Sequence, residues 1–218
     1  MKPFIFAFCA AGIALLSGCA VNGPTSGPYS VVAYRPKNPN NVRVKVSLSK
    51  QNVYVMEGDK VLMAAATCVG QPGHTTPTGT YRIYSKIPDK RSGAYGFRVQ
   101  DGGRIIPAES GASISGTYVG YPMAWWCEFS PGFGFHQGYV WPMPRTHGCL
   151  RLHKAVAPKF YALVKIGTPV NIANSQPEDA TVKVVRPQDY RDPDPPASYT
   201  ISSAVFQKPA GELLQEQP

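Results

Sequence analysis

The chain has 218 residues, enough for one domain with a sizeable core plus tails, whereas two full domains would be cramped. It carries 22 Lys and Arg against 13 Asp and Glu, a formal net charge of +9 that favours anionic partners. No zinc knuckle, helix-turn-helix or aromatic-basic RNA-binding pattern is present, so nucleic acid is not expected as a partner. Cell-wall polymer and anionic lipid head groups suit the compartment of an exported protein better, as the N-terminus indicates below, and the alternative is that the excess is a solvated surface.

The first nineteen residues have the pattern of an export signal. Lys2 precedes an apolar run over residues 4–16 that is too short for a stable membrane span. Residues 16–19 (LSGC) resemble a bacterial lipobox, so we expect residues 1–18 to be a lipoprotein signal peptide and Cys19 to be lipidated. The protein would then be exported and lipid-anchored in the cell envelope, on the periplasmic face of a bacterial membrane. The alternative is an ordinary secretory peptide with a chance cysteine at its end.

Residues 19–40 are rich in Pro and Gly and have no apolar period, which predicts a linker that holds a domain away from the membrane. Residues 42–48 alternate apolar and polar side chains, as a half-buried strand does. Residues 52–56 and 61–67 continue as two more strands with a hairpin turn at 57–59, so an antiparallel meander is predicted.

The middle of the chain is less regular. Residues 76–79 (TPTG) predict a turn before a strand over 81–85, and the Gly-rich, charged stretch 88–113 predicts a long loop or loose hairpin. Residues 121–129 contain Trp125 and Trp126, which favour a core and cleft wall over the alternative of carbohydrate stacking.

The C-terminal third begins with a predicted helix. Residues 153–164 have apolar side chains at helical spacing, with Pro158 tolerable only in the first turn. A closing strand is predicted over 167–172. From residue 174 to 218 the composition shifts toward Pro, Gln and Asp, which predicts a tail with at most one edge strand at 181–185.

Cysteine usage indicates one reactive thiol. Cys9 leaves with the signal peptide and Cys19 would carry lipid, so Cys68, Cys127 and Cys149 remain. An odd number in an oxidising compartment suggests one free thiol and at most one disulfide. Cys149 is the expected free thiol. Whether the other two form a bridge or are two buried thiols stays open at this stage.

A candidate catalytic cluster occupies residues 136–151. It brings a thiol, two imidazoles and a guanidinium into sixteen residues: His136, His147, Cys149 and Arg151. An isolated thiol is only a few per cent ionised at neutral pH, so a cysteine nucleophile needs a neighbouring base. These residues therefore predict covalent catalysis by Cys149.

Three motifs in one order resemble a known family. They are TPTG with a following tyrosine at 76–81, His136 with THGCLR at 146–151, and GTPVNI at 167–172. Over residues 42–173 the sequence resembles the L,D-transpeptidases of the YkuD type, which are bacterial cell-wall enzymes. The resemblance implies a mainly β fold with some α, a β-sandwich or mixed sheet with one helix packed after Cys149. It also implies a catalytic domain at 41–173, followed by a Pro-rich C-terminal tail at 174–218.

The resemblance also implies roles for the site. Cys149 is the expected nucleophile and His136 its base, held in the right tautomer by the carbonyl of Gln137. His147 is expected to position substrate or contribute to the oxyanion environment. The amides of Gly148 and Cys149 would stabilise the oxyanion. Expected substrate-binding residues are Arg151, Thr146 and, more weakly, Arg145, with a structural salt bridge as the alternative role for Arg151.

The expected activity is a cysteine-dependent L,D-transpeptidase that forms an acyl-enzyme from a peptidoglycan stem tetrapeptide and passes it to an amine. The acceptor would be another stem, giving a 3-3 cross-link, or an envelope protein. The alternatives are an L,D-carboxypeptidase using water and a non-catalytic peptidoglycan-binding lipoprotein. No cofactor or metal is expected, because a zinc site from His136, His147 and Cys149 matches no common zinc spacing. Only nine residues separate His136 from Thr146, fewer than in most relatives, which predicts a short-lid subgroup.

Overall fold

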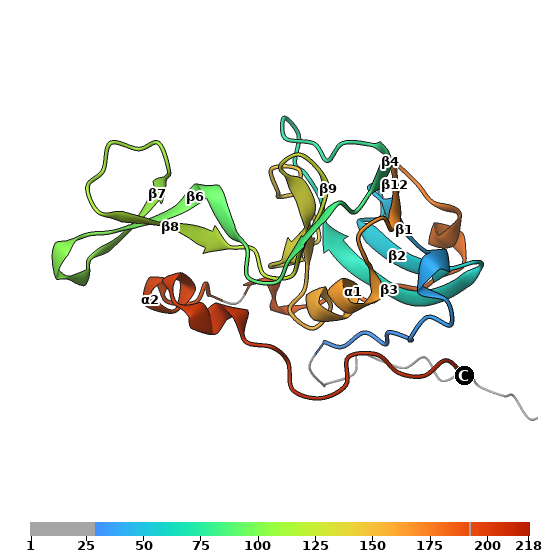
Figure 1. Ribbon diagram of the computed structural model, residues 1–218. Helices are drawn as coiled ribbons and strands as arrows, with labels where there is room; N and C mark the ends of the chain where they lie inside the picture. Colours follow the sequence, from blue (N-terminus) through green and yellow to red (C-terminus); the bar gives the residue numbers. More distant parts are fainter. Residues whose placement is uncertain (1–28, 192) are drawn as a thin grey trace, which may run out of the picture.

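The computed structural model describes residues 29–191 and 193–218, so the signal peptide, Cys19 and the first part of the linker lie outside the described residues. Within them, nine strands form one mixed sheet (Figure 1). In sheet order they are β4 (Gly79–Arg82), β12 (Pro169–Ala173), β1 (Val42–Ser47), β2 (Asn52–Glu57), β3 (Lys60–Cys68), β11 (Leu150–Leu152), β10 (Phe133–Gln137), β9 (Trp126–Ser130) and β5 (Ser85–Ile87).

The first three strands form the antiparallel meander that their alternation predicts. Glu57 pairs with Lys60, so the β2–β3 hairpin turns through two residues, and Gly58 takes the positive φ of 58° that such a tight turn requires. The closing strand β12 joins this meander parallel to β1. This half of the sheet is therefore built from chain segments more than a hundred residues apart.

The sheet curls until its two edges meet. β4 and β5 lie at opposite edges, yet only Ile83 and Tyr84 separate them in the chain. Tyr81 of β4 packs against Phe129 of β9 with ring centroids 5.3 Å apart. Two short strands therefore stand where the sequence predicted one over 81–85. The curled sheet encloses a core of valine, leucine and aromatic side chains and confirms the predicted mainly β fold.

The helix α1 (Ala157–Leu163) packs behind the strand that carries His136. Phe160 contacts Phe135 of β10 with ring centroids 4.4 Å apart, and both side chains are fully buried. Pro158 lies in the first turn, where its missing N–H breaks no helical hydrogen bond. The helix after the THGC motif is therefore confirmed, although it is shorter than the predicted 153–164.

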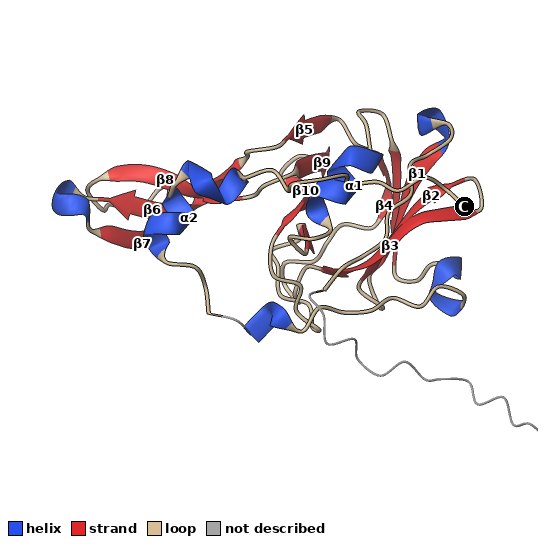
Figure 2. Ribbon diagram, turned by 90° about the horizontal axis from the view of Figure 1, so that it is seen from below, coloured by secondary structure: helices blue, strands red, loops and turns tan. Residues whose placement is uncertain are grey.

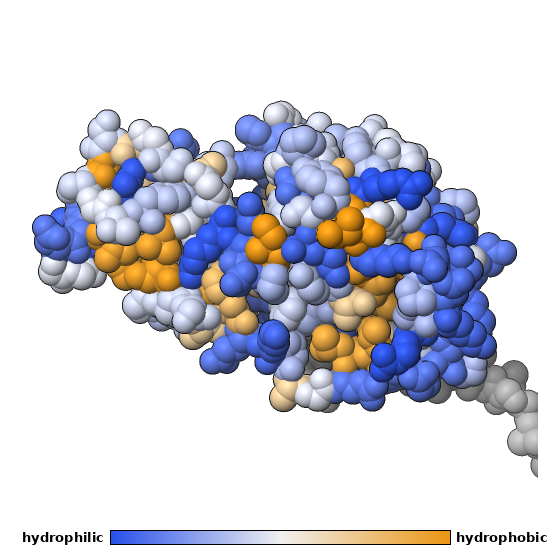
Figure 3. Space-filling view, in the orientation of Figure 1, coloured by the Kyte–Doolittle hydropathy of each residue, from blue (hydrophilic) through white to orange (hydrophobic). Residues whose placement is uncertain are grey.

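A second sheet occupies the stretch 88–113, for which the sequence predicts a long loop or a loose hairpin: its first two strands form a hairpin, and a third strand follows beyond the stretch. Its strands are β6 (Arg91–Val99), β7 (Ile105–Glu109) and β8 (Thr117–Pro122), in the order β7-β6-β8, with η2 (Asp101–Gly103) in the turn. It extends away from the large sheet, and Figure 3 shows apolar surface gathered on this part of the molecule. Gly96 and Gly120 permit the pairing, since a Cβ at Gly120 would lie 2.0 Å from the Ser92 carbonyl oxygen. The third strand was not predicted, since Gly120, on which its close pairing depends, has no side chain to indicate a strand.

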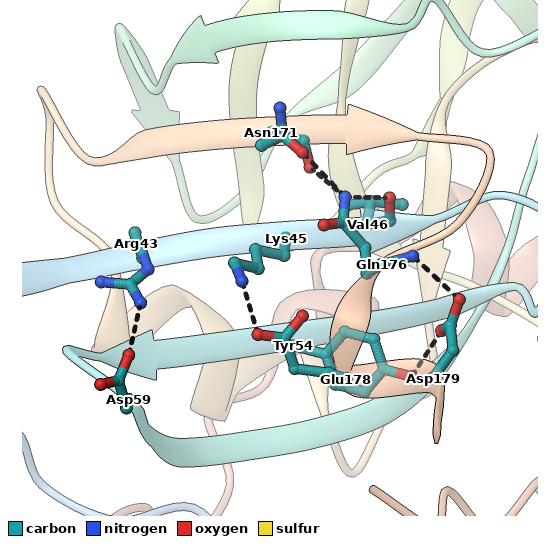
Figure 4. A network of polar contacts seen from close by, with 9 residues as sticks. All are labelled: Arg43, Lys45, Val46, Tyr54, Asp59, Asn171, Gln176, Glu178 and Asp179. Atoms are coloured by element: carbon teal, nitrogen blue, oxygen red, sulfur yellow. Dashed lines mark hydrogen bonds and ion pairs between the residues drawn. The ribbon is translucent and has the colours of Figure 1, made fainter. Parts of the chain in front are cut away.

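The segment after β12 is bonded to the large sheet from its start (Figure 4). In η3 (Pro177–Ala180), Glu178 pairs with Lys45 at 2.5 Å and Asp179 accepts from Tyr54 at 2.8 Å. Gln176 donates to the carbonyl of Val46 at 3.0 Å. No strand forms at 181–185, so that expectation is wrong; these residues continue as irregular chain.

The remaining C-terminal residues cross the molecule and return. They include η4 (Asp189–Arg191), α2 (Ala197–Ile201) and η5 (Ser203–Phe206), and Figure 2 shows α2 against the three-stranded sheet. Beyond them Gln215 bridges to Tyr34, and Arg35 pairs with both Glu212 and Glu216 at 2.8 Å.

The N-terminal stretch before the meander is equally well packed. Residues 29–38 lie along the domain and lead into η1 (Pro39–Asn41), so the described part of the expected linker is bound to the domain. None of the helices in residues 29–191 and 193–218 has the length and apolar character needed to cross a bilayer.

Candidate active site

The parallel pairing of β10 with β11 brings the histidine and cysteine motifs together. Phe135 pairs with Leu150 and His136 with Arg151. Side chains alternate between the faces of a strand, so His136 and Arg151 share the face opposite the core. Continuing the register by one residue puts Cys149 beside Gly134, on the same face as His136. Three of the predicted site residues therefore lie on one surface of two neighbouring strands.

His136 is buried and held in one tautomer. Its Nδ1 lies 2.8 Å from the carbonyl oxygen of Gln137, the group that the resemblance names. A carbonyl oxygen only accepts, so Nδ1 carries the hydrogen and Nε2 is left as an acceptor. Burial, reinforced by the charge of Arg151, lowers the pKa of His136 to about 4 against the opposing effect of the Gln137 carbonyl. The imidazole is therefore neutral at neutral pH, the state that a general base needs.

Cys149 is a free, half-buried thiol in the residue immediately before β11. Burial raises its pKa, although the Gly134 amide and the Arg151 charge oppose this effect. Its Sγ donates to the carbonyl oxygen of Gly132 at 3.5 Å. Thiol and imidazole therefore rest as a neutral pair. Cys68 and Cys127 are also free, so the open question of a bridge between them is answered in favour of two buried thiols.

Thr146 shapes the turn that presents Cys149. Its Oγ1 donates to the Cys149 carbonyl oxygen at 2.7 Å and accepts from the Gly148 amide at 3.1 Å. Gly148 has a φ of 103°, and a Cβ there would lie 2.4 Å from the Phe133 ring. Thr146 is buried and stabilises the turn through these hydrogen bonds. It does not face the solvent as a substrate-binding residue would.

The TPTG segment is tied to the same turn. Thr76 donates through Oγ1 to the carbonyl oxygen of Gly148 at 2.9 Å and accepts from the Gly70 amide at 2.9 Å. The TPTG segment therefore links the residues after β3 to the turn at residues 146–149, which we call the cysteine turn.

The expected oxyanion donors need one correction. The Gly148 amide already donates its hydrogen to Thr146 Oγ1, so it is not free to donate to a developing oxyanion. The Cys149 amide remains as the motif's candidate donor. The sequence could not reveal this, because the competing acceptor is a hydroxyl two residues away whose rotamer depends on the turn.

His147 lies exposed at the rim of the site. Its ring packs against His74 at 4.5 Å and Tyr95 at 5.2 Å between centroids. Tyr95 belongs to β6, so the three-stranded sheet reaches over to the cysteine turn. Nothing in the sequence indicates that Tyr95 reaches this site, and His74 is not among the residues predicted for it above.

The two candidate arginines have different surroundings. Arg151 is half-buried, and no carboxylate in the described part of the chain lies within ion-pair distance of it, so the salt-bridge alternative is not supported. Arg145 is exposed, with its guanidinium stacked over Trp141 at 4.1 Å from the ring centroid. Arg151 is therefore the better placed group for a substrate carboxylate.

A chamber of about 610 Å³ adjoins His136 and Arg151, within the range of ~300–1,000 Å³ typical of ligand pockets. One wall is the end of the β10–β11 pair and the loop after it, and a second is the end of β8 with Tyr121. The third comes from the C-terminal segment and includes Asp194 and Tyr199. Sequence reasoning missed this wall, because a proline-rich stretch carries no periodic signal of its docking site.

Metal binding has no geometric support in the described chain. Nowhere in residues 29–191 and 193–218 do three His, Cys, Asp or Glu side chains come together as a possible metal site. This includes the trio of His136, His147 and Cys149 that formed the zinc alternative.

Comparison with known proteins gives one family and a set of solved structures. A family model for the L,D-transpeptidase catalytic domain, YkuD, matches residues 41–172. No curated protein matches the chain significantly. The similar solved structures include L,D-transpeptidases from Stackebrandtia nassauensis (20% identity, TM-score 0.46), Enterococcus faecium (22%, 0.45) and Mycobacterium smegmatis (16%, 0.46). The alignments cover 66%, 61% and 61% of this chain and 60%, 50% and 58% of those chains, respectively.

Proposed function

Because the chain belongs to the YkuD family of L,D-transpeptidase catalytic domains, we propose that it is a cysteine-dependent L,D-transpeptidase acting on peptidoglycan stem tetrapeptides. The observation that carries this proposal is the shared face of β10 and β11. It gathers a free thiol at 149, a neutral imidazole at 136 and an arginine at 151 that has no carboxylate partner among the described residues.

The neutral pair fits general-base activation of the thiol. When a substrate carbonyl reaches Cys149, Sγ transfers its proton to Nε2 of His136 as the S–C bond forms. The Gln137 carbonyl stabilises the imidazolium through Nδ1–H. The tetrahedral intermediate collapses when the C–N bond breaks and the leaving amine takes the proton from His136. In the resting structure Sγ points to Gly132 O, so substrate binding has to redirect this hydrogen.

The acyl-enzyme is then consumed by a second nucleophile. We propose an amine as acceptor, either on a second stem, which gives a 3-3 cross-link, or on an envelope protein. Water, which would make the enzyme an L,D-carboxypeptidase, and a non-catalytic wall-binding role are the competing outcomes of the test below.

Position in the cell envelope belongs to the same proposal. A lipid on Cys19 would hold residues 41–173 at the periplasmic face of a membrane, within reach of the peptidoglycan layer. We also propose that the chain belongs to a short-lid subgroup, because only nine residues separate His136 from Thr146.

The test is incubation of the full chain with a purified disaccharide tetrapeptide, followed by mass spectrometry of the products. A transpeptidase yields a 3-3 linked dimer and free D-alanine, and a carboxypeptidase yields the tripeptide and D-alanine. The unchanged tetrapeptide in every sample, including those with added amine acceptors, would contradict catalysis and leave the binding role.

A further inference from the structure

A carboxylate stands in line with the nucleophile on the active-site face of the large sheet. Glu128 of β9 pairs with Gly134 of β10, and Gly134 lies beside Cys149 when the β10–β11 register is continued. Side chains alternate between the faces of a strand, and the neighbouring Phe129 is buried in the core, so Glu128 shares the face of Cys149. The strands that carry the carboxylate and the thiol stand two sheet spacings apart, which is about 10 Å.

Both oxygens of the Glu128 carboxylate are hydrogen-bonded to groups of the site. Oε1 accepts from the amide of Gly132 at 3.0 Å, and Oε2 accepts from Nε1 of Trp126 at 3.2 Å. The hydroxyl of Tyr84 is a further hydrogen-bond partner. Burial raises the pKa of Glu128, but these three hydrogen bonds and the charge of Lys90 lower it below its usual value, so the group is a carboxylate at neutral pH.

The first of these contacts connects Glu128 to the thiol. Gly132 lies in the turn between β9 and β10 and has a φ of 76°. Its amide is bound by Glu128, and its carbonyl oxygen accepts the hydrogen of Cys149 Sγ at 3.5 Å. The carboxylate therefore fixes the residue that accepts the thiol hydrogen in place of His136.

The second contact places an indole beside the base. Trp126 is buried, and its ring centroid lies 6.1 Å from that of His136. A Cβ at Gly134 would lie 2.8 Å from the same indole, so the ring covers the glycine between the carboxylate and the thiol. Because this space is filled by protein, the charge of Glu128 is screened less than a charge that acts through open water.

Charges of opposite sign act on Cys149 from two strands. Burial raises the pKa of the thiol most, the Gly134 amide and the Arg151 charge lower it, and the Glu128 charge raises it. His136, on the strand between, is neutral at neutral pH. The other titratable side chains at the rim of the site are His74, Tyr95 and His147. Among the groups that act on the thiol, Glu128 is thus the one that both opposes its ionisation and binds its hydrogen-bond partner.

We propose that Glu128 is a positioning residue that keeps Cys149 in its resting state, a neutral thiol bonded to the Gly132 carbonyl. Its carboxylate fixes the acceptor of the thiol hydrogen, and its negative charge disfavours a thiolate on the same face of the sheet. An incoming acyl donor has to break the Sγ–H···O contact, and the proton passes to Nε2 of His136 as the S–C bond forms. The inference rests on the proposed function for that donor and deepens it, since it concerns how the same nucleophile is restrained between turnovers.

The rate of Cys149 alkylation by iodoacetamide tests the effect of the charge. The reagent is neutral, so the removal of a charge does not change its attraction to the site. Glu128→Gln keeps the shape of the side chain and an acceptor for the Gly132 amide. A unit charge about 10 Å away changes an ionisation equilibrium about two- to fourfold, and the lower nucleophilicity of a less basic thiolate offsets part of this gain.

At pH 7 and low ionic strength, Glu128→Gln should therefore react about twofold faster than wild type. Arg151→Gln removes the opposite charge and should react more slowly than wild type. Asp59→Asn is the matched control, because Asp59 is an exposed carboxylate on the β2–β3 hairpin, and it should react at the wild-type rate. The rate is that of adduct formation, followed by intact-mass spectrometry.

A measurement on wild type tests the hydrogen bond without any substitution. The amide resonance of Gly132 should shift when acid protonates Glu128. Equal alkylation rates for Glu128→Gln and Asp59→Asn, or a Gly132 amide that does not respond to acid, would overturn the inference and leave the transpeptidase intact. Because neither measurement needs turnover, failure of the tetrapeptide assay would instead defeat the proposed function alone.

Discussion

In the resting enzyme Cys149 and His136 are a neutral thiol and a neutral imidazole, not a thiolate-imidazolium ion pair. Burial raises the pKa of the Cys149 thiol and lowers that of His136 to about 4, so both effects favour the neutral forms. Arg151 stabilises a thiolate but repels an imidazolium, so its two electrostatic effects have opposite consequences for an ion pair. The thiol therefore becomes nucleophilic when its proton is transferred during attack.

The pH dependence of alkylation tests this resting state. Iodoacetamide reacts with thiolate, so the rate at Cys149 should rise about tenfold per pH unit through neutrality and keep rising to pH 9. The sign follows from a thiol pKa raised above its usual value and an imidazole that holds no proton above about pH 5. The measurement is the rate of adduct formation by mass spectrometry, with Cys149→Ser as the blank. A plateau between pH 5 and 8 would show a thiolate-imidazolium pair instead.

At the scale of elements, the cysteine turn is the most tightly constrained segment of the site. Gly148→Ala would place a Cβ at a φ of 103° and 2.4 Å from Phe133, so it combines backbone strain with overlap. Gly167→Ala is the matched control, since Gly167 has a φ of 92° and open space around it. We expect the control to cost about 1–2 kcal/mol and Gly148→Ala about 2 kcal/mol more. Urea unfolding measures both, and equal losses would show that the overlap is relieved at no cost.

Docking of α2 depends on Arg91. Its guanidinium donates to carbonyls at the end of α2 and stacks on Phe206 at 4.9 Å from the ring centroid. Arg91→Gln should therefore lower hydrogen-exchange protection in residues 197–202 by about tenfold or more, with the large sheet unchanged. Arg98→Gln is the control, because Arg98 lies on the same strand but donates to the carbonyls of Ser110 and Gly116, in the segment between β7 and β8. Equal protection of α2 in both variants would show that other contacts dock the helix.

At the scale of the whole molecule, the sequence was most informative where structure is local. Strict alternation over 42–48 predicted β1, and the order of three motifs predicted the family and the mixed sheet. The hairpin at 91–109 was one of two alternatives predicted for its stretch, whereas β8 was missed, because Gly96 and Gly120 serve close backbone pairing that leaves no side-chain signal. The docking of residues 197–206 was not predicted, because Arg91 binds backbone carbonyls there and every sequence possesses such carbonyls. The same holds for the site. Cys149 and His136 lie in sequence motifs and were predicted, whereas Tyr95 and Asp194 belong to segments that reach the site only through contacts distant in the sequence.

The central claim is that Cys149 is the nucleophile of this fold, and acylation by a carbapenem tests it most directly. The strained lactam carbonyl offers the thiol an acyl donor that needs no stem peptide, so intact-mass spectrometry reads the covalent step alone. We predict one adduct on wild type and on Cys68→Ser, which removes a buried thiol, and none on Cys149→Ser. An adduct of unchanged yield on Cys149→Ser would contradict the account.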